Sequence, residues 1–179
     1  MGGLARGSPF GMRFPSPSRW ILPLVCSSLL PLLVSPALAT VRTWDGGAGD
    51  ALWHTAANWN PDGTPGPGDD LAIDVATTVT VSASGPMEFG SLLLGGSSAS
   101  TLIVSTGMGV SPGNMTVRDR GAFQQNSTHR LRFNAVTVEA GGRLTHSANG
   151  SSKQYVLDLW VVDSFTLQAG STITVDAKG

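Results

Sequence analysis

Apolar and polar residues alternate over short stretches along most of the chain after Asp70. The stretches are rich in Val, Thr, Leu and Ile and are separated by Gly, Ser, Asn and Pro, which is the pattern of short β-strands. It predicts strands at Leu71–Val75, Thr78–Ser82, Ser91–Leu94, Thr101–Ser105, Met115–Arg118, Ala135–Glu139, Tyr155–Val162, Phe165–Gln168 and Thr172–Asp176. The 3.6-residue periodicity of a helix is not found after Thr40, so the fold class predicted is all-β.

One sequence motif, here called the phrase, occurs three times in the second half of the chain. In each copy, a strand rich in β-branched residues is followed by a short polar break, a glycine and a second apolar position. The three copies are Asn114–Val117 with Gly121–Phe123, Ala135–Val138 with Gly141–Leu144, and Ser164–Leu167 with Gly170–Ile173. Aligning the phrases makes three threonines equivalent (Thr116, Thr137, Thr166) and three glycines equivalent (Gly121, Gly141, Gly170). Units that recur at roughly 20 to 30 residues are typical of solenoids, in which each unit buries its apolar face on a neighbour.

The repeat therefore predicts a right-handed parallel β-helix, a β-solenoid, over residues 71–179. A β-sandwich is the alternative, because strands spaced by about eight to twelve residues also fit that fold.

Residues 40–70 differ in composition from the predicted solenoid that follows. Each repeating unit of that solenoid is here called a rung. Trp44, Trp53 and Trp59 lie among many Gly, Pro, Asn and Asp residues, which favour turns and loops. We expect coil with a short strand at Val41–Trp44, forming a cap whose three rings are buried over the first rung. At the other end the chain stops after the strand at Thr172–Asp176, so we expect it to be the N-terminal piece of a longer protein or a truncated reading frame.

Residues 1–39 have the pattern of a signal peptide. Three arginines precede an apolar run from Trp20 to Leu33, and Ala37-Leu-Ala39 follows. This order predicts cleavage after Ala39 and a secreted or cell-surface protein. Prolines and serines interrupt the apolar run, so we expect no membrane span in the mature chain. Translation could start at Met1 or at Met12.

The cysteine content and net charge of the predicted mature chain bear on which partners it could bind. Cys26 is the only cysteine and lies in the apolar run, so the mature chain has none. Three of the 11 basic residues precede Thr40, which leaves 8 against all 12 acidic residues and a net charge near −4. A basic patch of the kind that binds nucleic acid is not found, so we expect no nucleic-acid partner.

The opening of the mature chain resembles that of large bacterial surface and secreted proteins with parallel β-helix bodies, both autotransporter-like and sorting-signal-bearing. The resemblance rests on Thr43-Trp-Asp-Gly-Gly47, Trp53, Ala57-Asn-Trp59 and the segment from Pro65 to Asp70, followed by Gly-punctuated Val-Thr-Val rungs. It extends over about Val41 to Gly179 and implies an extracellular, non-catalytic stalk or adhesin-like role.

One loop has the ligand spacing of a calcium site. Asn58, Asn60, Asp62 and Asp69 supply oxygens at positions one, three, five and twelve, with Gly63 at position six. The alternative is a turn-rich loop whose Asn and Asp side chains bond to the backbone, and the three prolines of the loop favour it.

Other candidate residues form no constellation that would indicate an enzyme. His54, His129 and His146 are not at metal-ligand spacing, and we predict no catalytic residue, metal or cofactor. Trp44, Trp53, Trp59 and Trp160 could instead stack on sugars, and Asp158 and Asp163 could flank such a platform.

Two functions remain open from the sequence. The first is an exported structural or adhesive surface protein whose partners are extracellular glycans or the surfaces of host or neighbouring cells. The second is a carbohydrate-binding module or a polysaccharide-lyase-like β-helix fragment, for which Arg118, Arg130, Arg132 and Arg143 would be the candidate bases.

Overall fold

The computed structural model describes residues 2–3, 39–82, 85–105 and 113–175. Residues 36–179 form one compact unit, and its buried core consists of residues from Trp44 onward. Residues 1 and 4–38 of the predicted signal peptide lie outside the described residues. Within the described residues, no helix has the length and apolar character needed to cross a membrane.

The compact unit consists of two β-sheets. The seven-stranded sheet contains, in spatial order, β11 (Leu159–Leu167), β9 (Leu131–Val138), β7 (Asn114–Val117), β5 (Ser91–Leu94), β3 (Asp70–Ile73), β1 (Val41–Trp44) and β2 (Trp59–Asn60). The five-stranded sheet contains β12 (Thr172–Thr174), β10 (Arg143–His146), β8 (Gly121–Gln125), β6 (Ser100–Val104) and β4 (Thr77–Val81). The prediction of an all-β protein is therefore confirmed.

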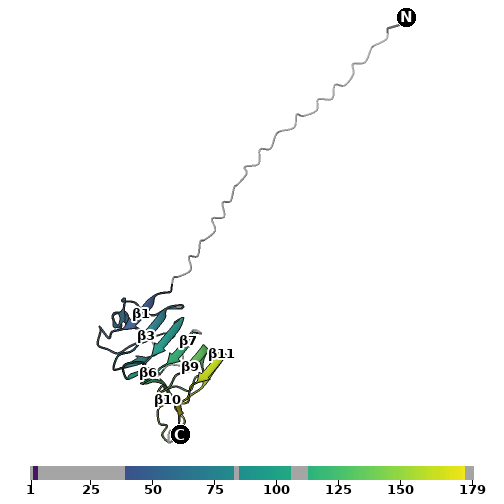
Figure 1. Cartoon of the computed structure of the whole chain (residues 1–179). Helices are drawn as coiled ribbons and strands as arrows, with labels where there is room; N and C mark the ends of the chain where they lie inside the picture. Colours follow the sequence, from purple (N-terminus) through teal and green to yellow (C-terminus); the bar gives the residue numbers. More distant parts are fainter. Residues whose placement is uncertain (1, 4–38, 83–84, 106–112, 176–179) are drawn as a thin grey trace. The chain divides into compact units, whose positions relative to one another are not determined.

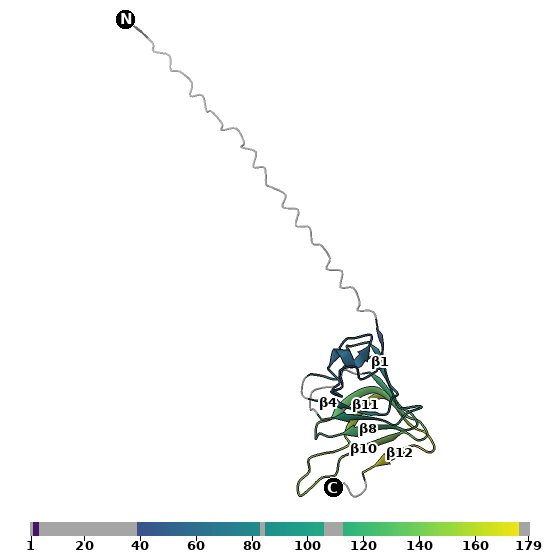
Figure 2. The same cartoon turned by 90° about the vertical axis from the view of Figure 1, so that its left-hand side faces the viewer.

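From β3 to β12 the chain alternates between the two sheets, and each strand pairs in parallel with the strand two places later. The order β1, β3, β7, β9, β11 is visible along one sheet in Figure 1, and β4, β8, β10, β12 along the other in Figure 2. Parallel neighbours need a crossover between them, and here the crossover contains a strand of the opposite sheet. This pairing differs from the antiparallel pairing of the β-sandwich alternative.

The strand register confirms the alignment of the three threonines in the repeated phrases. Thr116 of β7 pairs with Thr137 of β9, which pairs with Thr166 of β11. Val117, Val138 and Leu167 form the neighbouring row. Because successive side chains of a strand point to opposite faces, the threonine row faces outward when the valine row faces the core.

Apolar rows that run across the strands form the core. One row from the seven-stranded sheet contains Leu71, Leu92, Met115 and Val136, and one from the five-stranded sheet contains Val79, Leu102, Phe123 and Leu144. All eight side chains are buried. In each row an apolar side chain lies next to an apolar side chain of the following strand, so successive strands share one continuous core.

Several details differ from the sequence-based expectation. The strands β8 and β10 were not predicted, and the two strands predicted at Tyr155–Val162 and Phe165–Gln168 are one strand, β11, with a register shift between Val161 and Ser164. A short 3₁₀ helix, η1, occurs at Ala56–Asn58.

The alignment of the three glycines is wrong by one residue in the first phrase. The pairing of Arg143 with Ala122 and with Thr172 makes Gly121 equivalent to Gly142, whereas Gly141 is equivalent to Gly170. Gly141 and Gly170 have φ of +80° and +86°, and the matching position one strand earlier is Arg120, at +59°. The backbone conformation is thus retained where the residue type is not.

The segment 40–70 is continuous with the sheets rather than a separate layer. β1 pairs in parallel with β3, and β2 pairs antiparallel with the outer edge of β1. The predicted burial of the three tryptophans is confirmed, since Trp44, Trp53 and Trp59 are 4%, 0% and 0% exposed. They belong to the same core cluster as the rows of the rungs.

Candidate functional site

The four residues of the predicted calcium loop are in two different environments. Asn58 is buried, and its Oδ1 accepts a hydrogen bond from the Ala48 amide over 3.0 Å while its Nδ2 donates to Asp50 and to the Leu52 carbonyl. Asn60 and Asp62 are exposed. The oxygen of Asn58 is therefore already used to hold the loop at residues 48–52.

Asp69 links Thr40 and Arg42 to the loop that precedes β3. Its carboxylate accepts hydrogen bonds from the amides of Thr40 and Gly66, each over 3.0 Å, and from Nε of Arg42 over 3.1 Å. Burial alone would raise the pKa of Asp69, but these three donors outweigh it and hold the pKa below its ordinary value. Both carboxylate oxygens thus have protein donors, as the turn-rich-loop alternative expects.

The tryptophans predicted as sugar-stacking candidates also divide into two environments. The rings of Trp44, Trp53 and Trp59 have no face open to solvent, so stacking on a sugar would require the cap to open. Trp160, on β11, is 55% exposed. The guanidinium carbon of Arg132, its partner on β9, lies 5.5 Å from the ring centroid.

The three histidines lie apart. His54 belongs to the cap, where its Nε2 is 3.0 Å from the Pro86 carbonyl oxygen, and His129 is exposed between β8 and β9. His146 ends β10 and is buried, with its Nδ1 2.7 Å from the Ser147 carbonyl oxygen. In the described residues, no group of three or more His, Cys, Asp or Glu side chains is arranged to hold a metal ion.

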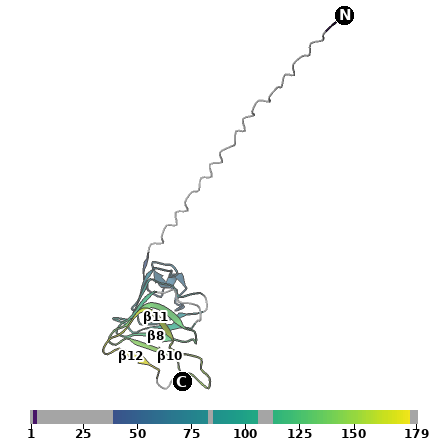
Figure 3. The same cartoon turned by 90° about the vertical axis from the view of Figure 1, so that its right-hand side faces the viewer.

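Three hollows lie at the rung that consists of β11, β12 and the loop at residues 147–157, here called the C-terminal rung. Figure 3 shows β12 and β10 beside one another at this end, with β11 on the opposite sheet. Sequence reasoning named Trp160 and Asp158 at this surface but missed its apolar hollows, because the strands there have the same apolar pattern as the buried ones.

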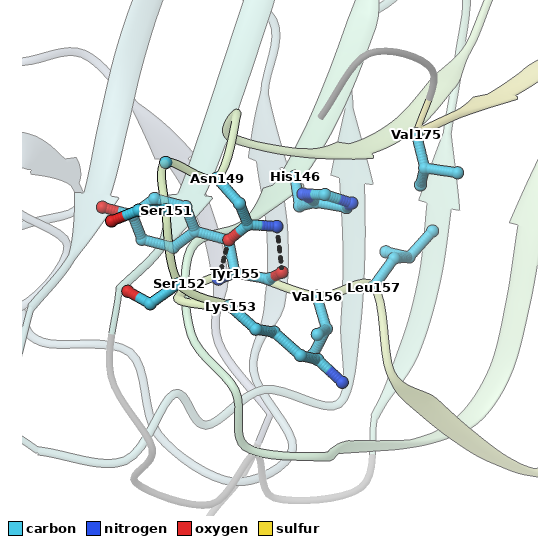
Figure 4. A pocket seen from close by; sticks show the side chains of 10 residues that line it. His146, Asn149, Ser151, Ser152, Lys153, Tyr155, Val156, Leu157 and Val175 are labelled. Atoms are coloured by element: carbon cyan, nitrogen blue, oxygen red, sulfur yellow. Dashed lines mark hydrogen bonds between the residues drawn. The ribbon is translucent and has the colours of Figure 1, made fainter. Parts of the chain in front are cut away.

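One hollow, of about 640 Å³, lies under the loop at residues 147–157 (Figure 4). His146 lies at its base, Lys153 and Tyr155 come from the loop, and Val175 borders it from the end of β12. The Asn149 side chain closes the loop, because its Oδ1 accepts from the amides of Gln154 and Tyr155, each over 2.7 Å, and its Nδ2 donates to the Tyr155 carbonyl.

A second hollow, of about 380 Å³, opens directly on the end of the core. It is lined by apolar side chains of the last two rungs, namely Leu144, Leu157, Leu159, Val161, Phe165 and Ile173. The base is buried Leu144, whereas Phe165 and Ile173 are 45% and 44% exposed. The second hollow is therefore the uncovered end of the apolar rows.

A third hollow, of about 260 Å³, lies beside Trp160. Arg130 and Asp158 border it and form an ion pair with 2.9 Å between Nε and Oδ1. An exposed ring beside a carboxylate and a guanidinium offers an apolar face together with hydrogen-bond acceptors and donors, which is chemistry that suits a sugar. Asp163, the other carboxylate considered for such a platform, is exposed on β11.

Comparisons of the chain with protein-family models, with curated proteins and with solved structures each found no match.

Proposed function

We propose that the chain is an exported structural or adhesive protein of the cell surface, and that its two sheets are faces of a right-handed parallel β-helix stalk. The observation that carries the proposal is the strict alternation of β3 to β12 between two parallel sheets. Crossovers between parallel strands of one sheet are right-handed in about 98% of cases, which favours a right-handed coil here.

The division of side chains between the two faces of the strands also supports a structural role. Inward positions in the rows described above are apolar and buried, and the outward row Thr116, Thr137, Thr166 is polar. A stack built from such rungs extends by adding strands rather than by enclosing a reaction site. The resemblance of the opening segment to bacterial surface proteins supports the same function.

Export of the chain is the part of the proposal that can be tested directly. The full chain with a C-terminal tag, expressed in a bacterial host, should appear outside the cytoplasm, and its first residue should be Thr40. An otherwise identical chain lacking residues 1–39 should stay in the cytoplasm. A full-length product that remains in the cytoplasm and still contains Trp20 would rule out the export that the proposal requires.

A second candidate, saccharide binding, is favoured by one observation, the exposed Trp160 beside the Arg130–Asp158 ion pair. Affinity electrophoresis in gels containing neutral or uronic-acid polysaccharides would test it. Retardation that is lost in Trp160→Ala and kept in Val162→Ala, an exposed residue of the same strand, supports binding at this surface. Equal mobility of all three proteins in every gel rules it out.

A further inference from the structure

Asn149 and Gly150 lie together in the loop at residues 147–157, and they form the one Asn-Gly pair of the sequence. Asparagine is among the thermolabile residues of proteins, because the nitrogen of the following residue can attack its side-chain amide. Most residues shield that nitrogen with a side chain, whereas glycine has no Cβ and allows close approach. The sequence therefore places its most reactive asparagine in this loop.

Gly150 is open on the side from which a side chain would project. It is exposed, and an added Cβ would meet nothing within 4 Å. In the described chain, residues 147–155 belong to no helix or strand. The Gly150 nitrogen and the Asn149 side chain can thus approach one another by rotation of the loop backbone, without disrupting a sheet.

The side-chain carbonyl of Asn149 is polarised by two main-chain donors. Its Oδ1 accepts hydrogen bonds from the amides of Gln154 and Tyr155, each over 2.7 Å. Negative charge develops on this oxygen when a nucleophile adds to Cγ, and amide donors already in place at such an oxygen stabilise the addition. The bonds that close the loop therefore also lower the barrier to attack on Asn149.

We propose that Asn149 is a site of spontaneous deamidation. The Gly150 nitrogen loses its proton and forms a bond to Cγ of Asn149, the bond between Cγ and Nδ2 breaks, and Nδ2 takes up a proton and leaves as ammonia. Solvent water then opens the cyclic imide at either of its carbonyls, which gives aspartate or isoaspartate at position 149. Water is the only co-reactant, and nothing is oxidised or reduced.

The reaction removes a donor that the loop uses. Nδ2 of Asn149 donates to the Tyr155 carbonyl over 3.0 Å, and both products have a carboxylate, which cannot donate. In isoaspartate the main chain also gains a methylene group, so the amides of Gln154 and Tyr155 lose their common acceptor. Deamidation therefore loosens the loop and adds a negative charge to it.

The modification concerns a different property from export and does not depend on it. The purified full chain is kept for days in mildly alkaline buffer, and its tryptic peptides are measured by mass spectrometry. The peptide that contains Asn149 should gain one dalton and separate into aspartate and isoaspartate forms, whereas the peptide that contains Asn134 should stay unchanged. A synthetic peptide with the sequence of residues 146–157 gives the reference rate, and the folded chain should react at least as fast.

Two variants locate the attacking nitrogen. Gly150→Val should slow the reaction by roughly tenfold to a hundredfold, because a β-branched side chain restricts the approach of the nitrogen. The space around Gly150 should leave the far-UV spectrum and melting curve unchanged. Ser151→Val is the matched control, since Ser151 is exposed one position further along, and it should react at the unsubstituted rate.

Limited digestion with trypsin measures the effect on the loop. Lys153 is exposed in the loop, and cleavage after it should be faster in the deamidated protein than in the fresh protein.

Three results would overturn the proposal. The first is a folded chain that reacts more slowly than the peptide, which would mean that the bonds from Gln154 and Tyr155 protect Asn149. The second is equal slowing in Gly150→Val and Ser151→Val. The third is equal cleavage after Lys153 in the fresh and the deamidated protein, which would mean that the Nδ2 donor does not hold the loop closed.

Discussion

Trp59 donates its indole N–H to the main-chain carbonyl oxygen of Trp53 over 2.8 Å, and the two rings meet edge to face with centroids 5.1 Å apart. Trp44 contacts Trp59 in the same geometry, and Phe89 lies next to Trp53 in the core. Aromatic pairs of this kind stabilise by about 0.5–1.5 kcal/mol beyond the area that they bury. The cap is therefore attached to the rungs through edge-to-face and tilted contacts between aromatic rings.

Substitution of Trp59 should separate the contribution of its ring from that of its hydrogen bond. Trp59→Ala empties a buried large-aromatic site and should lower the free energy of unfolding by about 3–5 kcal/mol. Trp59→Phe keeps a ring but loses the bond to Trp53, and should cost less. Denaturant titration measures both. Two variants as stable as the unsubstituted chain would mean that the cap does not support the rungs.

Tryptophan fluorescence of the chain from Thr40 should report one exposed ring and three buried ones. Iodide should quench the emission of Trp160, which is 55% exposed, and leave most of the emission of Trp44, Trp53 and Trp59. Trp160→Phe should abolish the quenchable fraction. Quenching that persists in this variant would show that the cap opens in solution.

Gly141 should tolerate a side chain poorly. Its φ is +80°, a region that β-branched residues rarely adopt, and an added Cβ would collide with the Asp119 carboxylate. Gly141→Val should therefore cost about 1–3 kcal/mol of stability through strain. Gly150→Val is the control, because a Cβ at Gly150 meets nothing within 4 Å. Equal melting temperatures for the two variants would contradict the expected strain.

Acid should weaken the attachment of the cap through Asp69. Hydrogen bonds from Thr40, Gly66 and Arg42 keep its pKa in the folded state below the unfolded value of about 3.9. The stabilisation is therefore complete above the unfolded pKa and is lost as the pH falls through the folded pKa.

The melting temperature should accordingly fall as the pH is lowered from about 5 to about 2, and Asp69→Asn should show a shallower fall. At neutral pH this variant should lose about 1–3 kcal/mol, since buried donors would lack a charged acceptor. Parallel pH profiles for the two proteins would show that Asp69 does not control the acid transition. Asp74, whose pKa is lowered by bonds from the Ser97 and Ser98 amides, is expected to add to the fall in both.

The local pattern of the sequence was enough to predict many of the strands and part of their register. Ser91–Leu94 forms a strand with the predicted bounds, and Thr116, Thr137 and Thr166 are in register as the repeated phrase indicated. The burial of the cap tryptophans also followed from composition, because large rings in a cysteine-free chain must supply apolar contact area. These features depend on residue type and on the alternation of side chains between the two faces of a strand, and both can be read from the sequence.

The strands β8 and β10 required the tertiary structure. Gly-Ala-Phe-Gln-Gln and Arg-Leu-Thr-His are weak strand formers by composition, and they are extended because β6, β8, β10 and β12 pair in sequence. The one-residue error in aligning Gly121 has the same origin. Backbone hydrogen bonds set the register, and Arg120 adopts the positive φ that glycine adopts one rung later.

The difference between a covered and an uncovered row was also decided by tertiary structure alone. Val136 and Phe165 have the same pattern of neighbours in the sequence and are paired with one another, yet one is 0% and the other 45% exposed. The sequence by itself determined that both face inward, because alternation along a strand is local. Which of them is buried depends on whether another strand lies beside it, and that is a property of the assembled sheets.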